Sequence, residues 1–198
     1  GQHYLDRIND AASRMRQLIN DLLAFSRVSS KERKLVDIDL AEIVEGVVSD
    51  LHVRIEETDA SVTVSALPIV EGDPTQMRQL MQNLISNALK FTRDGVRPEV
   101  SITASTRGGI DETGMPVRTC ALTFKDNGIG FENRFAEQIF TIFQRLHGRA
   151  EYAGTGIGLT TCRKIVERHH GTISAHGEPG EGATFTVTMP LKQPNEED

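Results

Sequence analysis

Residues 83–92 read NLISNALKFT, and they form the second half of a helix that the sequence predicts from Asp73 onward. Within this stretch Asn83, Asn87 and Lys90 recur at helical spacing, so they share one face. The opposite face is apolar and suits a packed core. The stretch therefore predicts a helix that lies on a core and presents a polar row to a cleft or to solvent.

The chemistry of this polar row suits a magnesium ion and the phosphates that accompany it. Magnesium prefers oxygen ligands and keeps several waters, so one amide oxygen together with phosphates can hold it. Lys90 adds a positive charge at the end of the row. The same row is also typical of a solvated helix face, and by itself it does not distinguish these two interpretations.

A second informative stretch is DNGIGF, residues 126–131, which follows an apolar strand. A carboxylate at a strand end, such as Asp126, can accept a hydrogen bond from an exocyclic amine like that of adenine. Asp-Asn-Gly alone indicates a turn. The second glycine, Gly130, argues against a plain turn, because an ordinary hairpin needs only one glycine.

The third stretch is GTGIGL, residues 154–159, where glycines precede a helix predicted to begin near Ile157. Backbone N–H groups at a helix N-terminus bind phosphate well. The spacing matches neither the dinucleotide-binding pattern nor the P-loop. The preceding polar residues 144–155 predict a loop, which is either a hinge or a lid over a nucleotide.

The other elements predict an α+β fold, with helices on one face of a mixed sheet. The sequence predicts a long helix over residues 3–28, whose apolar positions follow heptad spacing. Such a helix either docks on its own domain or packs against an external helix, and the sustained heptad favours the external helix, most simply that of a second copy. The predicted helices and strands after it are strands 35–38, 62–66, 100–105, 119–125, 172–176 and 184–189, and helices 40–55, 73–91, 133–140 and 157–169.

Composition limits the classes of function. The 198 residues are 38% hydrophobic and 25% charged, which allows a packed core. A net charge of −6 argues against nucleic acid as a partner. No apolar run reaches the ~18 residues of a membrane span. Cys120 and Cys162 match no metal spacing, so we expect reduced core thiols and a cytoplasmic protein.

Taken together, five ordered segments resemble the ATP-binding domain of sensor histidine kinases, in the superfamily that includes gyrase, the mismatch-repair ATPases and heat-shock chaperones. NLISNALKFT is similar to the family's N box, DNGIGF to its G1 box, IFTIFQRL to its F box, GTGIGL to its G2 box and GEGATF to its G3 segment. The resemblance covers roughly residues 35–190. It implies a two-layer α/β sandwich as the catalytic domain, over residues 31–191, with a polar tail over 192–198.

The resemblance also implies an ATP site. It assigns Asn87 to magnesium, Lys90 to phosphate and Asp126 to the adenine amine. It gives Gly128 and Gly130 to the base pocket, and Gly154, Gly156 and Gly158 to the phosphates. Thr184 would support the base, and Arg145 would reach the terminal phosphate. The whole implied set is Asn83, Asn87, Lys90, Asp126, Gly128, Gly130, Phe143, Arg145, Gly154, Thr155, Gly156, Gly158, Leu159 and Thr184.

One departure within the N box favours a kinase. Gyrase-like members place a Glu one turn before the magnesium-binding Asn, where it activates water. This sequence has Asn83 there, and an amide is no general base. Hydrolysis of ATP by water should therefore be slow.

Residues 1–30 resemble the second helix of the family's dimerisation and phosphotransfer hairpin. The motif that carries the phosphate-accepting His is absent, and His3 does not fit it. The resemblance thus implies a homodimer through this helix, an upstream sensor domain and a response regulator, with the acceptor His outside this chain. Two alternatives stay open: a non-catalytic interaction module and a gyrase-like ATPase.

Overall fold

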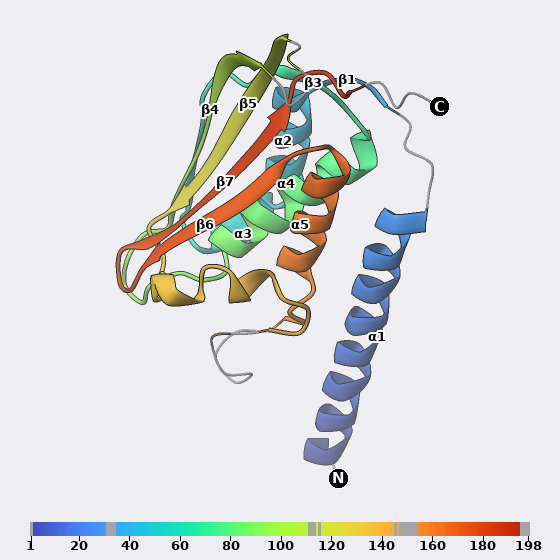
Figure 1. Ribbon diagram of the computed structural model, residues 1–198. Coiled ribbons are helices and arrows are strands. Elements are labelled where there is room, and N and C mark those ends of the chain that lie inside the picture. The colour runs from blue at the N-terminus through green and yellow to red at the C-terminus, as the bar shows by residue number, and fades with distance from the viewer. Residues whose placement is uncertain are drawn as a thin grey trace.

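The computed structural model describes residues 2–30, 35–110, 114, 116–144, 146 and 154–194. A five-stranded mixed sheet forms one layer, helices form the second on one of its faces, and a long N-terminal helix lies beside them (Figure 1). This is the predicted α+β sandwich.

The main sheet has the strand order β2-β4-β5-β7-β6. Strand β2 runs parallel to β4, and the other neighbouring pairs are antiparallel. A smaller antiparallel sheet pairs β1 with β3. The strands are β1 (Val36–Asp39), β2 (Ser61–Val64), β3 (Ile69–Gly72), β4 (Glu99–Ile110), β5 (Pro116–Asp126), β6 (Thr172–Glu178) and β7 (Gly182–Pro190).

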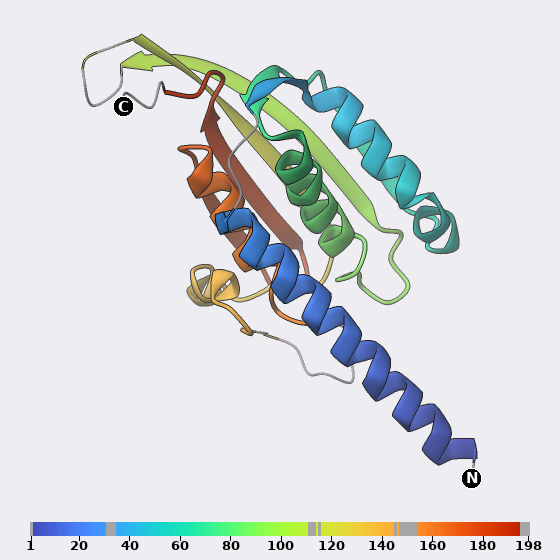
Figure 2. The same cartoon turned by 90° about the vertical axis from the view of Figure 1, so that its right-hand side faces the viewer.

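The helices that cover the sheet lie side by side on one face (Figure 2). Helix α1 lies along α5 instead of on the sheet. Among the described residues, no helix is both long and apolar enough to cross a bilayer. The helical elements are α1 (Gln2–Ser30), α2 (Leu40–Asp50), α3 (His52–Glu57), α4 (Pro74–Ala88), α5 (Gly158–Arg168) and the 3₁₀ turns η1 (Asn133–Phe135) and η2 (Gln138–Phe140).

The core lies between α4 and the inner face of the sheet. Helix α4 supplies Leu80, Leu84 and Ile85, which are essentially inaccessible to solvent, as the apolar face of the sequence predicts. Asp73 caps this helix by accepting hydrogen bonds from the N–H groups of Thr75 and Gln76. The cap fixes the residue at which α4 begins.

Two predicted helices differ from the structure, and one observed strand was not predicted. The helix predicted over 40–55 breaks at Leu51, whose N–H is shared between the carbonyls of Val47 and Val48, so α2 tightens and ends there. The helix predicted over 133–140 is two separate 3₁₀ turns. Strand β3 was not predicted, because four residues after Pro68 are too short to show a strand period.

Part of the predicted polar tail is packed. Lys192 forms an ion pair with Asp37 of β1. The N–H of Gln193 donates to Glu71 Oε2 at 2.7 Å, and the Gln193 side chain is buried. Residues 192 and 193 therefore extend the folded domain over the small β1–β3 sheet.

Candidate functional site

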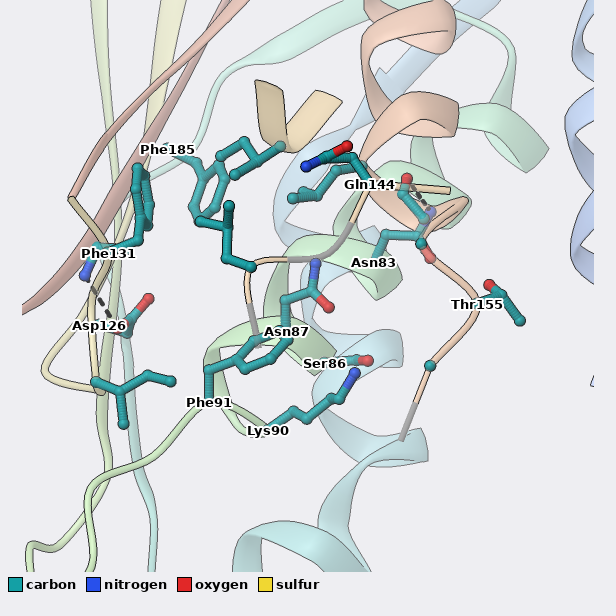
Figure 3. Close-up of a pocket in the computed structure, with 18 of the residues that line it drawn as sticks. Asn83, Ser86, Asn87, Lys90, Phe91, Asp126, Phe131, Gln144, Thr155 and Phe185 are labelled. Carbon is teal, nitrogen blue, oxygen red and sulfur yellow. Dashed lines mark hydrogen bonds between the residues drawn. The ribbon is translucent and has the colours of Figure 1, made fainter. Parts of the chain in front are cut away.

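One cavity of about 490 Å³ brings the three sequence motifs together. This volume is typical of small-molecule sites. Asp126 and Phe131 lie at one end, Lys90 and Thr155 at the other, and Asn87 between them (Figure 3). Its lining residues are Gln17, Asp21, Asn83, Ser86, Asn87, Lys90, Phe91, Asp126, Ile129, Gly130, Phe131, Ile139, Gln144, Leu146, Gly154, Thr155, Gly156, Gly158, Leu159, Ala183 and Phe185.

Asp126 supplies a buried carboxylate at the first end. Its Oδ1 accepts hydrogen bonds from the N–H groups of Gly128, at 2.9 Å, and Ala183, at 3.1 Å. Burial raises the pKa of the Asp126 carboxyl above its ordinary value, and the two N–H groups oppose that rise. Because both bonds go to Oδ1, the second oxygen is directed to the cavity, where it can accept a bond from an amine (Figure 3).

Glycines allow the Asp126 turn to pack closely on its neighbours. A Cβ on Gly128 would lie 2.0 Å from the carbonyl oxygen of Phe91. Gly130 has a φ of 61°, and a Cβ there would lie 2.0 Å from the carbonyl oxygen of Glu178. Gly130 lines the cavity, whereas Gly128 acts behind it by orienting Asp126.

Arg93 braces the same end. Its Nε donates to the carbonyl of Asn127 at 2.8 Å, and its guanidinium also donates to the carbonyl of Gly180 at 2.5 Å. The Asn127 side chain in turn accepts from the N–H of Glu99 and donates to the carbonyl of Arg97. Arg93 thus ties the chain after α4 to the two turns that surround Asp126.

The other end of the cavity combines a lysine with the glycine loop. Lys90 Nζ lies 2.7 Å from where a Cβ on Gly154 would be, so the lysine ammonium lies directly against this glycine. Gly156 has a φ of 75°, which favours glycine. Helix α5 begins two residues later, at Gly158, and this places the positive end of a helix dipole at the cavity. Such an end suits phosphate groups.

Asn83 and Asn87 lie between the two ends, one turn apart on α4 (Figure 3). The Asn83 amide Nδ2 donates to the carbonyl of Gly158 at 3.2 Å. Asn83 therefore fastens α4 to the first turn of α5. The Asn87 side chain points into the middle of the cavity (Figure 3).

Ten of the residues proposed from the sequence line this cavity: Asn83, Asn87, Lys90, Asp126, Gly130, Gly154, Thr155, Gly156, Gly158 and Leu159. Phe143 does not line it; its side chain is exposed, while its N–H donates to the carbonyl of Gly156 at 3.1 Å. Arg145 lies outside the described residues.

The structure contradicts the role that the sequence predicted for Thr184, which was to support the base. Its neighbours Ala183 and Phe185 line the cavity, and successive side chains of a strand point to opposite faces. The Thr184 side chain therefore lies on the other face of β7, where it cannot support a base. The buried alternation of Ala183, Phe185 and Val187 was visible in the sequence as an apolar period of two.

The sequence interpretation missed several lining residues. Most are apolar residues that form the walls of the cavity, and the hydrophobic pattern of the sequence does not distinguish them from ordinary core residues. Ser86 was detectable, because it lies three residues after Asn83 on the same helix face. Gln17 and Asp21 of α1 had no local signal. The missed set is Gln17, Asp21, Ser86, Phe91, Ile129, Phe131, Ile139, Gln144, Leu146, Ala183 and Phe185.

The two cysteine thiols are buried, and the Cys162 thiol packs behind the cavity, against the Asn83 side chain. Burial raises the pKa of Cys120 to about 11 and that of Cys162 to about 12, so both remain protonated. Within the described part of the chain, no three His, Cys, Asp or Glu side chains gather in a way that could hold a metal ion. Any ion here would need amide oxygens and oxygens from a bound molecule.

A model of the family described as histidine kinase-, DNA gyrase B-, and HSP90-like ATPase matches residues 72–193. Phytochrome-like protein Cph1 of Synechocystis sp. is 39% identical over 188 residues, which cover 95% of this chain and 24% of that protein. Cyanobacterial phytochrome A of Nostoc sp. is 42% identical over 182 residues, covering 92% and 22% respectively. The chain thus spans about a quarter of the length of these relatives.

A solved structure, full-length ShkA in complex with AMPPNP, resembles the whole arrangement. The TM-score is 0.74 at 25% identity, and the match covers 98% of this chain and 39% of the ShkA chain. The match therefore includes the N-terminal helix as well as the sandwich.

Proposed function

The chain belongs to the family of histidine kinase-, DNA gyrase B- and HSP90-like ATPases, and on this premise we propose that it is the ATP-binding catalytic domain of a sensor histidine kinase. It presents the γ-phosphoryl group of ATP to a histidine outside this chain. The observation that carries the proposal is one cavity that has a buried carboxylate at one end and a lysine with a helix N-terminus at the other.

In this proposal one end of the cavity binds the adenine base of ATP and the other end binds its phosphates. Asp126 accepts the adenine amine through Oδ2, while Gly130 and the apolar walls enclose the base. Lys90, the glycine loop 154–158 and the N-terminus of α5 neutralise the phosphates. Phosphoryl transfer needs positioning and charge neutralisation more than covalent catalysis, so this set is sufficient for the donor side.

Magnesium fits the residues present. Asn87 points its amide into the cavity between the base end and the phosphate end (Figure 3). One amide oxygen with phosphate oxygens and waters satisfies magnesium, which seldom uses an all-protein cage. When bound, the ion would neutralise charge on the phosphates, and Asn87 is the residue that would hold it.

Asn83 favours transfer to a histidine over hydrolysis. In this chain Asn83 donates to the Gly158 carbonyl, and its amide cannot accept a proton from water. Water is therefore not activated at this position. During transfer to histidine, a ring nitrogen of the acceptor forms the bond to the γ-phosphorus, the bond to the β-phosphate oxygen breaks, and ADP leaves.

The proposed partners follow from the same assignment. Helix α1 pairs with a second copy and with the helix that carries the acceptor histidine. A sensor domain lies upstream, and the phosphoryl group passes on to an Asp of a response regulator. The exposed apolar side chains of α1 support pairing with a second copy, because an apolar stripe on a helix is stable only when it is packed against another surface.

Calorimetry with AMPPNP and magnesium tests the nucleotide site. The wild-type chain should bind one equivalent. Asp126→Asn presents an amide to the adenine amine, and it should weaken binding roughly 10- to 100-fold, the cost of a lost hydrogen bond to a charged group. Asp50→Asn, the same change on α2 outside the cavity, should bind like wild type. Absence of binding at millimolar nucleotide, or equal binding by wild type and Asp126→Asn, would contradict the proposal.

A further inference from the structure

Helix α1 is docked on the catalytic domain through one of its faces. Val28 is 2% exposed. The ammonium of Lys164, on α5, lies 4.1 Å from the ring centroid of Phe25. Both views show the C-terminal part of α1 near α5 (Figures 1 and 2). The docking brings this helix to the edge of the nucleotide cavity.

The same helix face contributes two side chains to the cavity itself. Gln17 and Asp21 are one turn apart, on the face that also carries Phe25 and Val28. Asp21 Oδ2 accepts a hydrogen bond from the Thr155 hydroxyl at 2.5 Å, and Asp21 Oδ1 accepts one from Gln17 Nε2 at 2.7 Å. Both carboxylate oxygens are thus held in a fixed position.

The contact falls at the phosphate end. Thr155 lies between Gly154, whose neighbour is the Lys90 ammonium, and Gly156 of the loop before α5. Figure 3 shows Thr155 on the same side of the cavity as Asn83 and Lys90, and far from Asp126. While Thr155 donates to Asp21, its hydroxyl proton cannot be given to a phosphate. The carboxylate also places a negative charge where a triphosphate would lie, and like charges a few ångströms apart repel.

We propose that Asp21 sets the nucleotide affinity of this site by competing with the phosphate chain for Thr155 and repelling it. The docked position of α1 and a bound triphosphate then oppose each other. Such coupling is reciprocal. If bound nucleotide weakens the docking of α1, the docked helix must weaken the binding of nucleotide by the same factor. The inference rests on the proposed function of the cavity as an ATP site.

Asp21→Asn removes the charge while keeping the size of the side chain. Calorimetry with AMPPNP and magnesium should show roughly fivefold or greater tightening relative to wild type, the lower range of typical couplings between sites. The gain should be smaller for ADP and smallest for AMP, which carry fewer phosphate charges. Asp50→Asn, an equal change of net charge on α2, should leave the affinity unchanged.

The outcomes separate this inference from the proposed function. If wild type binds and Asp21→Asn binds equally, the inference fails and the ATP site stands. If Asp21→Asn binds more weakly in the presence of magnesium only, Asp21 is an ion ligand and the inference is wrong. If neither chain binds nucleotide, the proposed function fails and the inference fails with it.

Hydrogen exchange on the same proteins gives an independent readout. Backbone amides of residues 17–28 should exchange faster when AMPPNP is added to wild type, because the nucleotide displaces the helix from Thr155. In Asp21→Asn this increase should shrink. Unchanged or slower exchange in wild type at saturating AMPPNP would overturn the proposal, and thermal melting of both proteins verifies that they are folded.

Discussion

Asp126 shows how a single residue is tuned by its surroundings. Desolvation raises its carboxyl pKa, yet two backbone N–H groups fix one of its oxygens. Ionised Asp126 is therefore retained at an energetic cost to the fold, because a buried charge is less well solvated than an exposed one. A residue kept at a cost to stability is typical of a binding site.

A pH series measures this cost. A carboxyl whose pKa is higher in the folded than in the unfolded state destabilises the fold when ionised, and this penalty disappears as pH falls through the folded pKa. Asp126→Asn should therefore have a larger free energy of unfolding than wild type at pH 7, and the gap should narrow as pH falls. Urea denaturation at successive pH values measures the gap, and a gap that widens toward acid pH would contradict the assignment.

Individual site residues were predictable where chemistry and spacing agreed. Asn83, Asn87 and Lys90 share a helix face, and the structure places all three on one cavity. Thr184 was wrong because motif resemblance was preferred over strand alternation. Asp21 was out of reach, since its place in the cavity depends on how a distant helix docks.

At the scale of elements, two helices hold the site, and a buried histidine joins them. His169, at the end of α5, is fully buried. Its Nε2 accepts from the N–H of Asp73, the cap of α4, at 3.1 Å, and its Nδ1 lies 2.7 Å from the carbonyl of Ile165. This geometry fits the neutral ring with its proton on Nδ1. His169 thus connects the start of α4, which carries the polar row, to the end of α5, whose N-terminus lies at the phosphate end of the cavity.

Replacing this histidine should loosen both helices. His169→Ala leaves a cavity and an unpaired N–H on Asp73, and it should cost roughly 2–4 kcal/mol of unfolding free energy. His176→Ala, on an exposed position of β6, should change stability by less than about 0.5 kcal/mol. Chemical denaturation of both variants provides the test, and equal losses would show that His169 has no special linking role.

The elements themselves were largely predictable from periodicity and caps. Asp73 and Pro74 correctly mark the start of α4. The boundary between α2 and α3 was not predictable, because Leu51 continues the apolar pattern while its backbone turns. Short β3 is held by β1 and by the chain after β7, and no window of sequence contains these non-local contacts.

At the scale of the whole molecule, α1 has two unlike faces. One face docks on α5 through Phe25 and Val28. The face opposite carries exposed apolar side chains at heptad spacing. These are Ile8, Met15, Ile19 and Leu22, with exposed fractions from 46% to 62%. The domain therefore covers one side of the helix and leaves the apolar side chains of the other exposed.

This stripe predicts self-association of the chain. Sedimentation should show a mass that rises with protein concentration. Ile19→Asn removes an apolar contact from each copy and should weaken the association roughly tenfold or more. Ile110→Asn, an equal change at a 74% exposed position of β4, should have no effect. A strictly monomeric mass at all concentrations would contradict this use of the helix.

The sandwich was predictable as a class because its motifs occur in a fixed order, and the family match agrees with the resemblance seen in the sequence. The strand order, with β2 parallel to β4 at one edge, was not predictable. Whether a strand lies at the edge or in the middle of the sheet depends on its pairing with strands distant in sequence. The connecting segments are long enough to allow several strand orders.

Transfer of the γ-phosphoryl group tests the central claim most directly. The chain is incubated with magnesium and γ-labelled ATP, together with a separate dimerisation domain that carries an acceptor histidine. The account predicts label on that histidine, its loss when Asp126→Asn replaces wild type, and little phosphate released to water. Steady release of phosphate by the chain alone, with no label on the acceptor, would contradict it.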